Sequence, residues 1–234
     1  MTDQPIATPP PNDPRAYTTD ALCRLMLERN RATIRVQKTA FALPKLERIV
    51  TAALELSNSQ GFQAMSLRDL SAASGVSMGG MYAYFDGKTT LLRMILSEVT
   101  AAVTAVLASP PDHLAQDPRE HLMWLIDSHL HLTETMLPWF VFAFMEAKSF
   151  PPSERRQAVD SEIQTERYFA EVIARGLHTG CFRPETSPLL PALIKPLLQE
   201  WYVKRAKYHR RGVCIETYIA TVQDIVLSAC ATKG

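Results

Sequence analysis

The chain has 234 residues, of which 47% are hydrophobic, which is enough for one large domain or two small ones with a packed core. Leu, Ala, Glu and Arg dominate, and long stretches lack the alternating Val/Ile/Thr pattern of strands, so the composition predicts an all-helical fold. The overall net charge of +1 does not by itself point to a nucleic-acid partner. Residues 15–42 alone, however, carry a net charge of +4. A positive excess in one short segment suits contact with phosphate groups.

Several classes of protein are not favoured by the sequence. The four cysteines lack CxxC spacing and His partners at zinc-ligand spacing, which favours reduced thiols over a thiol-based redox sensor. No apolar run approaches the roughly twenty residues of a membrane span, and the N-terminus does not have the pattern of a signal peptide, so we expect a cytoplasmic protein without a membrane partner. No Gly-rich phosphate loop, nucleophile elbow or metal motif is found, so we expect no enzyme, no cofactor and no metal site.

The most informative stretch reads SLRDLSAASGVSMGGMYAYFDGKTTLL. Its first serine, Ser66, and Asp69 have the spacing of a capping box, so a helix is expected to begin there. Gly75 stands where a helix C-terminus needs a left-handed residue, and Ser77 can cap a second helix that ends near Phe85. Two short helices joined by a Gly-containing turn predict a helix-turn-helix, whose second helix would enter the major groove of DNA.

An ordered series of positions without gaps extends this motif in both directions: Ile49, Ala52-Ala53, Leu56, Gly61-Phe62, Ser66-Leu67-Arg68-Asp69-Leu70, Gly75-Val76-Ser77, Tyr82, Tyr84-Phe85, Lys88 and Leu91-Leu92. The series resembles the DNA-binding domain of the tetracycline-repressor (TetR) family. The resemblance implies a DNA-binding head with a helix-turn-helix over residues 43–92 and a helical ligand-binding and dimerisation domain over residues 93–234. It also implies a homodimeric regulator, most simply a repressor that a small molecule releases from a palindromic, double-stranded DNA operator. A ligand-independent DNA-binding protein or an activator of the same fold is the alternative.

The second helix lacks several residues that the family uses to read bases. Met78, Gly79, Gly80 and Ala83 stand where the family commonly has a basic residue, a Gly, a small hydroxyl residue and a polar residue. Specificity is therefore expected to depend on other side chains, and a protein-interaction module with a vestigial head is a further alternative. The residues expected to contact DNA are Arg68, Ser77, Met78, Gly79, Gly80, Tyr82, Tyr84, Lys88, Arg31, Arg35, Lys38 and Lys45.

Residues 1–42 extend beyond the usual start of the family. Residues 1–14 are Pro-rich and are expected to be disordered, and a helix is expected from Asp20 to about Lys38. Its positive charge favours a basic arm that follows the DNA backbone or enters the minor groove. Its stripe of Leu22, Leu25 and Met26 favours an added helix that packs on its own or the partner subunit. Both roles can hold at once.

The remaining chain reads as further helices. They are expected over residues 44–59, 88–108, 153–178 and 214–230, after the starts Asp117-Pro118 and Leu137-Pro138, and from Ser187 through the basic run 204–211. The dense aromatic and Met residues are either plain core or the lining of a pocket for a hydrophobic or aromatic effector. The candidate pocket residues are Trp124, His129, Met136, Phe140, Phe144, Phe169 and Trp201.

Two further patterns carry expectations about binding. Asp127, His131 and Glu134 fall on one helix face, which favours a solvated stripe over a metal site or pH sensor. The last helices have broad apolar surfaces, and in the family they pair with their copies in a four-helix dimer interface. The expected interface residues are Leu197, Trp201, Tyr218, Val222, Ile225 and Val226.

Overall fold

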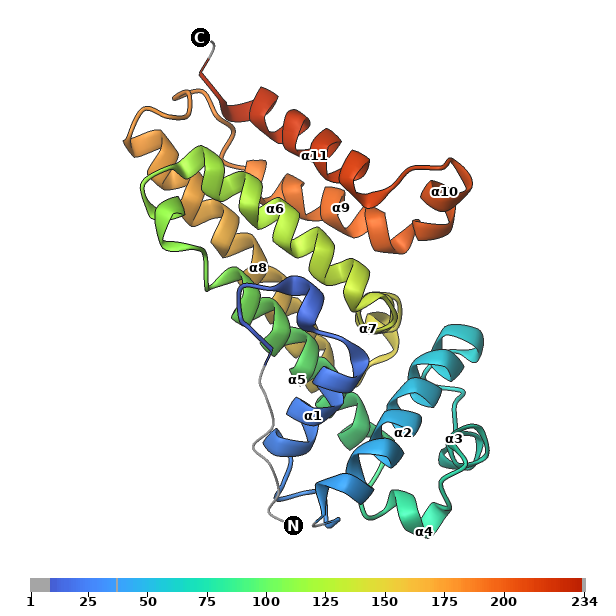
Figure 1. Ribbon diagram of the computed structural model, residues 1–234. Coiled ribbons are helices and arrows are strands. Elements are labelled where there is room, and N and C mark those ends of the chain that lie inside the picture. Colours follow the sequence, from blue (N-terminus) through green and yellow to red (C-terminus); the bar gives the residue numbers. More distant parts are fainter. Residues whose placement is uncertain (1–8, 37, 233–234) are drawn as a thin grey trace. The chain divides into compact units, whose positions relative to one another are not determined.

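The computed structural model describes residues 9–36 and 38–232, and within these ranges the secondary structure is helical apart from one isolated bridge between Phe182 and Ala231 (Figure 1). The α-helices are α1 (Thr19–Arg29), α2 (Thr39–Gln60), α3 (Leu67–Ser74), α4 (Met78–Met81), α5 (Lys88–Leu107), α6 (Pro118–Thr135), α7 (Leu137–Met145), α8 (Pro152–His178), α9 (Leu190–Val203), α10 (Arg205–Arg210) and α11 (Ile215–Cys230). Short 3-10 turns are η1 (Pro14–Ala16), η2 (Asp112–Ala115) and η3 (Ala147–Ser149). The predicted all-helical fold is confirmed.

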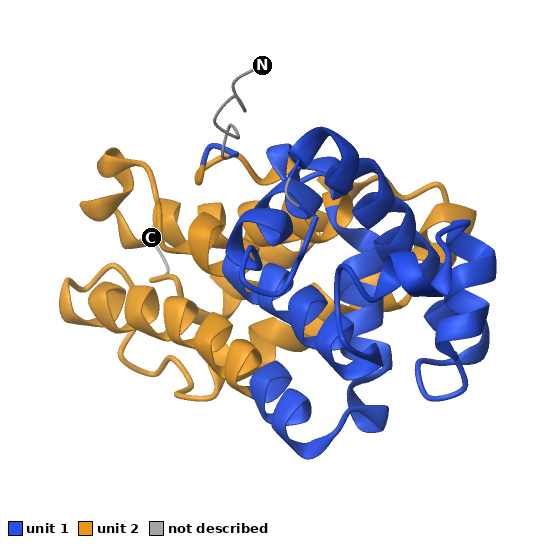
Figure 2. Ribbon diagram, turned by 90° about the horizontal axis from the view of Figure 1, so that it is seen from below, with its two compact units in different colours: residues 1–10, 16–101, 136–159 blue, residues 11–15, 102–135, 160–234 orange. Residues whose placement is uncertain are grey.

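The chain divides into two compact units (Figure 2). Unit 1 contains residues 16–101 and 136–159, and unit 2 contains residues 11–15, 102–135 and 160–232. The boundaries that we expected after residues 42 and 92 both fall within unit 1. They therefore remain a proposal about functional regions and do not describe these compact units.

In unit 1, the N-terminal extension forms a packed helix that is shorter than predicted. Thr18, not Asp20, caps α1, because its Oγ1 accepts a hydrogen bond from the Ala21 amide at 3.3 Å. The helix ends at Arg29 because the Asn30 side chain donates to the Met26 carbonyl at 2.8 Å and competes with further helical turns. α1 packs on α2 and buries Leu22, Cys23, Leu25, Met26 and Leu27. The packing role that we considered for the extension therefore holds for α1.

The proline-rich N-terminus was expected to be disordered over residues 1–14. Residues 1–8 lie outside the described ranges. Pro14, by contrast, is buried in η1, and the Asp13 carboxylate accepts the Arg15 amide at 3.0 Å. The expectation is therefore wrong for this last part of the segment, because local hydrogen bonding and burial order it.

α2 also begins earlier than predicted, at Thr39, so that Pro44 lies inside the helix. A proline lacks the amide that would bond one turn back, which normally limits it to the first turn. The inner face of α2 compensates by burying Leu46, Ile49 and Ala53 almost completely. α7 packs on α2, and Phe62, just after α2, meets the rings of Phe142 and Phe150 edge-on.

In unit 2, α6 pairs with both α9 and α11, and the two latter helices also contact each other (Figure 1). α6 begins as predicted at Pro118, since the Asp117 carboxylate accepts the amides of Arg119 and Glu120 at 2.9 and 3.0 Å. The single helix predicted from Ser187 through residue 211 is wrong. Lys204 adopts φ −112° and ψ 25°, which breaks the stretch into α9 and α10.

α5 corrects one expectation about apolar runs. By length and composition it is able to cross a membrane, with a mean hydropathy of 1.6, although we expected no such segment. In the folded chain 61% of its apolar window is buried, which is typical of a core helix. It also carries Glu98, whose side chain is fully buried. Packing within the protein thus accounts for the apolar character of α5.

Candidate DNA-binding site and effector region

The helix-turn-helix is built from local hydrogen bonds that the sequence predicts. The Ser66 hydroxyl accepts the Asp69 amide at 3.1 Å, and the Asp69 carboxylate accepts the Ser66 amide at 2.9 Å, so the capping box is complete. Gly75 ends α3 in the left-handed region with φ 63°, where a residue with a side chain would be strained. The Ser77 hydroxyl then accepts the Gly80 amide at 3.2 Å and caps α4. The predicted motif is confirmed.

The second helix of the motif is shorter than predicted, because α4 ends at Met81 and not near Phe85. Gly79 and Gly80 each weaken a helix by roughly 1 kcal/mol. The chain continues in tighter turns, in which the Tyr84 amide donates to the Met81 carbonyl at 2.8 Å. Met81 and Phe85 are buried, as their expected core role requires.

Most of the residues expected to contact DNA lie on the surface of this motif. Arg68 is exposed at the start of α3, and Ser77 and Gly79 are exposed at α4. The Tyr82 side chain is 48% exposed, while Met78 and Gly80 are partly covered. Lys45 is exposed on α2. The exposed surface of the motif therefore has few polar side chains that could contact DNA, and part of this surface is backbone.

Tyr84 does not belong to this surface. Its side chain is 1% exposed, and its hydroxyl donates to the Ala42 carbonyl at 3.0 Å. Burial raises the pKa of the phenol. The expectation that Tyr84 reaches DNA is therefore corrected: it ties α2 to the turn after α4.

Lys88 is also occupied within the protein. Its ammonium donates to the carbonyls of Phe62, Gln63 and Met65 at 3.0, 3.0 and 3.1 Å. It also lies 4.8 Å from the centre of the Phe62 ring. Burial lowers its pKa. The ammonium that we expected at a phosphate instead satisfies the carbonyls of the turn after α2, which sequence spacing could not show.

The segment after α1 reaches the turn that follows α4. The Arg35 amide donates to the Ala83 carbonyl at 2.7 Å, although the two residues are far apart in sequence. The side chains of Arg35 and Lys38 are exposed. Arg31 pairs with Glu28 at 2.6 Å. This hydrogen bond thus fixes the backbone at Arg35 to the turn that follows α4.

The residues expected to line an effector pocket are divided between the two units. Met136, Phe140 and Phe144 belong to unit 1, and Phe144 is 41% exposed. Trp124, His129, Phe169 and Trp201 belong to unit 2. Phe169 and His129 are fully buried, and Trp124 lies beside His121 with their rings 5.8 Å apart.

Trp201, which we expected in both the pocket and the dimer interface, has a different environment. Its ring is fully buried and lies 4.9 Å from the Tyr218 ring and 5.5 Å from the Tyr208 ring. Its indole N–H donates to Glu134 at 2.8 Å, and Arg205 lies over the same ring. Within unit 2, therefore, Trp201 holds α6, α9 and α10 together.

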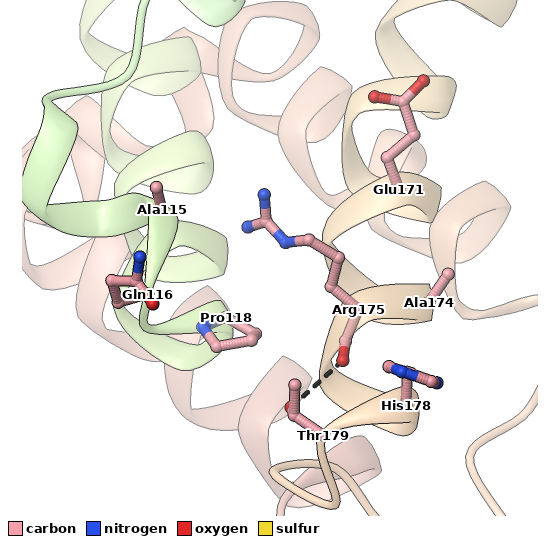
Figure 3. A pocket seen from close by; sticks show the side chains of 8 residues that line it. All are labelled: Ala115, Gln116, Pro118, Glu171, Ala174, Arg175, His178 and Thr179. Atoms are coloured by element: carbon pink, nitrogen blue, oxygen red, sulfur yellow. Dashed lines mark hydrogen bonds between the residues drawn. The ribbon is translucent and has the colours of Figure 1, made fainter.

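A pocket of about 640 Å³ lies in unit 2 between η2 with the start of α6 and the end of α8 (Figure 3). It contains none of the predicted pocket residues, and its lining is more polar than expected: Ala115, Gln116, Pro118, Glu171, Ala174, Arg175, His178 and Thr179. The Arg175 guanidinium donates to Nδ1 of the buried His121 at 2.7 Å. Burial and Arg175 lower the pKa of His121 to about 4.

The polar stripe on α6 is only partly solvated, since the Asp127 and Glu134 side chains are 46% and 31% exposed but His131 is buried. His131 is 8% exposed, and it accepts from Arg15 at 2.7 Å and donates to the Asp127 carbonyl at 3.1 Å. Glu134 accepts from Arg205 at 2.8 Å. Arg15 and Arg205, from other segments of unit 2, thus supply hydrogen-bond partners to His131 and Glu134. Among the described residues, no group of three or more His, Cys, Asp or Glu side chains could hold a metal ion.

The exposed apolar face of α9 and α11 differs from the one that we expected. Tyr218, Val222 and Val226, like Trp201, are buried within the chain, so they belong to its own core. Ile225 is 50% exposed, and Leu197 is partly exposed. Sequence analysis missed Leu189 and Leu193, which are 64% and 59% exposed. Their spacing with Leu197 marks one helical stripe, which was the available signal.

The two capped helices, the left-handed Gly75 and the exposed second helix define a DNA-binding protein of the helix-turn-helix class. Residues 49–95 match the family model described as "Bacterial regulatory proteins, tetR family". The chain thus carries a TetR-type DNA-binding domain over these residues and is similar in sequence and fold to transcriptional regulators of the TetR family.

Individual relatives agree with this assignment. The HTH-type transcriptional regulator HbdR of Aromatoleum sp. (strain CIB) is 24% identical over 172 residues, which cover 71% of this chain and 75% of HbdR. A tetR-family regulatory protein from Rhodococcus RHA1 has a similar fold, with a TM-score of 0.69, 20% identity and coverage of 85% of this chain and 100% of that one. A putative transcriptional regulator from Saccharomonospora viridis in complex with choline has a TM-score of 0.61 and 19% identity, with coverage of 80% and 97%.

Proposed function

We propose that this chain is a homodimeric repressor that binds a palindromic operator and is released from it by a small hydrophobic molecule. The observation that carries the proposal is the capped helix-turn-helix, which exposes Ser77, Gly79 and Tyr82 at and beside its second helix. Such a helix fits the major groove of B-DNA. The proposal also places the protein in the cytoplasm, where operator DNA is found.

The proposed DNA contacts combine few base readers with several phosphate contacts. Arg68 is the best candidate for a guanine or a phosphate, and Met78 can contact a thymine methyl group. The other proposed contacts are Ser77, Gly79, Gly80, Tyr82, Lys45, Arg31, Arg35 and Lys38. The fixed position of Arg35 beside Ala83 supports a role for the extension in this set, whereas the burial of Tyr84 and the internal bonds of Lys88 remove those two.

A second copy of this chain is the proposed partner of the apolar stripe. Leu189 at the start of α9, Leu193 and Leu197 on α9, and Ile225 on α11 are exposed or partly exposed, and burial on a second copy would remove their apolar surface from water. A two-fold interface brings the same surface from both copies together, and two heads then match two half-sites.

Effector release requires a ligand that binds the DNA-free form more tightly than the DNA-bound form. DNA must then weaken ligand binding by the same factor. The similar regulator from Saccharomonospora viridis was solved with choline, which supports a ligand-responsive role for a domain of this fold. We propose that the effector binds among the helices of residues 93–234.

Footprinting on the DNA that flanks the chain's own gene tests the proposal. The expected result is one symmetric protected site that is lost at high salt. The double variant Arg35→Gln/Lys38→Gln should weaken this protection and flatten its salt dependence, because each lost phosphate contact removes counterion release. Arg210→Gln, an exposed site on α10, is the matched control and should leave protection unchanged. No protection at low salt would contradict the proposal and favour a vestigial head.

A further inference from the structure

The inner face of α9 carries one charged residue among apolar and aromatic ones. The buried residues of this helix are Leu190, Pro191, Ile194, Lys195, Leu198, Trp201 and Tyr202. Lys195 is only 7% exposed, although lysine is almost never buried without a partner of opposite charge. α9 packs on α6 within unit 2 (Figure 1). The buried Lys195 therefore belongs to the helical core of that unit.

The nearest polar partner of Lys195 is neutral. Its ammonium donates to Nε2 of His129 on α6 at 3.3 Å, and His129 is fully buried. Burial and the neighbouring ammonium hold the pKa of His129 well below its usual range, so the imidazole carries no charge near pH 7. Among the described residues, no Asp or Glu forms an ion pair with Lys195.

One carboxylate acts on Lys195 from a distance. Glu162 on α8 favours the charged ammonium, but its own Oε1 accepts the Gln199 side chain at 2.8 Å. Burial outweighs this attraction and lowers the pKa of Lys195 to about 8. The ammonium is therefore still mostly charged at neutral pH, and its desolvation is not repaid by a nearby negative charge.

A buried charge without a counterion is costly, and an apolar side chain of similar length would avoid that cost. An anion that binds beside Lys195 would offset the free-energy cost of removing the ammonium from water, whereas a cation would be repelled. A carboxylate matches the donors of the ammonium and allows the remainder of the molecule to lie against apolar side chains of α6 and α9.

We propose that Lys195 binds the carboxylate of an amphipathic effector and that His129 positions the ammonium for it. This inference rests on the proposed effector-binding role and specifies the chemical class of the ligand. Sequence analysis predicted an apolar lining with His129 as its polar group, and Lys195 adds a positive charge to that description. An inserted carboxylate must also separate α6 from α9 locally, which gives the ligand a preference for one conformation of this unit.

Paired ligands test the inference on the full-length chain. Straight-chain carboxylates from butyrate to dodecanoate and a series of phenylalkanoates are each compared with the primary amide of the same skeleton, and binding is measured by calorimetry. At least one carboxylate should bind the wild type at least about tenfold more tightly than its amide, as expected for a buried charge-assisted hydrogen bond. In Lys195→Met the two should bind within about twofold of each other.

Controls separate a charge effect from a loss of structure. Lys204→Met removes an exposed ammonium just beyond α9 and should keep the preference for the carboxylate. Lys195→Gln, a second neutral variant, should lose the preference as Lys195→Met does, and circular dichroism confirms that each variant is folded. The inference is overturned if no carboxylate in either series binds better than its amide, or if the preference survives in both Lys195 variants.

Binding to operator DNA is measured in parallel without ligand. If the free protein binds a symmetric site but shows no Lys195-dependent preference for carboxylates, the inference fails and the proposed regulator stands. If the preference is found and no DNA is bound, the ligand site stands and the proposed regulator fails.

Discussion

Glu98 makes the stability of unit 1 depend on pH in a direction that the structure defines. Its side chain lies on α5 with no exposed surface and pairs with Arg29 of α1, which is 43% exposed. One carboxylate oxygen, Oε1, has no hydrogen-bond partner. Burial raises the pKa of Glu98 from its usual 4.5 to about 7, even though Arg29 opposes the shift. The folded protein therefore holds this proton more tightly than the unfolded chain does.

The magnitude follows from linkage. A pKa raised on folding contributes stability that is fully present below the unfolded value of about 4.5 and is lost as pH rises through about 7. A shift of between two and three units corresponds to about 3 kcal/mol in the free energy of unfolding. In Glu98→Gln the titrating group is absent while the shape is kept. Because pH 5 lies slightly above the unfolded pKa, the wild type should lose about 2–3 kcal/mol relative to this variant between pH 5 and pH 8.

Urea unfolding at both pH values, followed by circular dichroism, measures this difference directly. Glu55→Gln, an exposed glutamate of α2, is the control and should parallel the wild type at both pH values. If the difference between wild type and Glu98→Gln were the same at pH 5 and pH 8, the carboxylate would not be desolvated in the folded protein and the reasoning would be refuted.

Three further substitutions test the helix-turn-helix. Gly75→Ala places a side chain at φ 63° with open space around it, so only backbone strain of about 1–2 kcal/mol should appear in unfolding experiments; an unchanged stability would contradict the left-handed turn. Lys88→Met removes three hydrogen bonds to carbonyls and should lower the melting temperature without changing the salt dependence of DNA binding; a reduced salt slope would restore the phosphate contact. Arg68→Ala should weaken operator binding by about 1–3 kcal/mol and relax preference at one base pair, as measured by competition with variant duplexes; equal losses on all sequences would indicate a phosphate contact.

Features that depend on neighbouring residues were predictable from sequence. The capping box of Ser66 and Asp69, the left-handed Gly75 and the cap at Ser77 each involve residues within three positions of one another. The start of α6 at Pro118 follows from the same kind of local hydrogen bonding. These short-range interactions explain why the helix-turn-helix was found correctly.

Features that depend on distant partners could not be predicted in the same way. Tyr84 and Lys88 have polar groups that suit DNA, but their hydrogen bonds go to carbonyls of residues more than twenty positions away. Two helix ends were not predicted because a single residue ends the helix: the side chain of Asn30 ends α1, and the backbone angles of Lys204 end α9.

The sequence also could not show which apolar residues of a helix are buried within their own unit and which remain exposed. Trp201 and Val226 have the composition of an interface, yet they complete the core of their own unit. The exposed stripe includes Leu189 and Leu193, which lie within the predicted helical span but were not among the expected interface residues. The buried ammonium of Lys195 gave no sequence signal, because a single lysine on a helix normally lies at the surface.

The central claim is that two copies of this chain bind one symmetric DNA site through their helix-turn-helix motifs. Native mass spectrometry of the protein with the protected duplex measures this directly. The expected result is a complex with two chains per duplex. Arg68→Ala should weaken this complex, and a duplex with one scrambled half-site should not form it. A complex with one chain per duplex, or equal binding to the scrambled duplex, would contradict it.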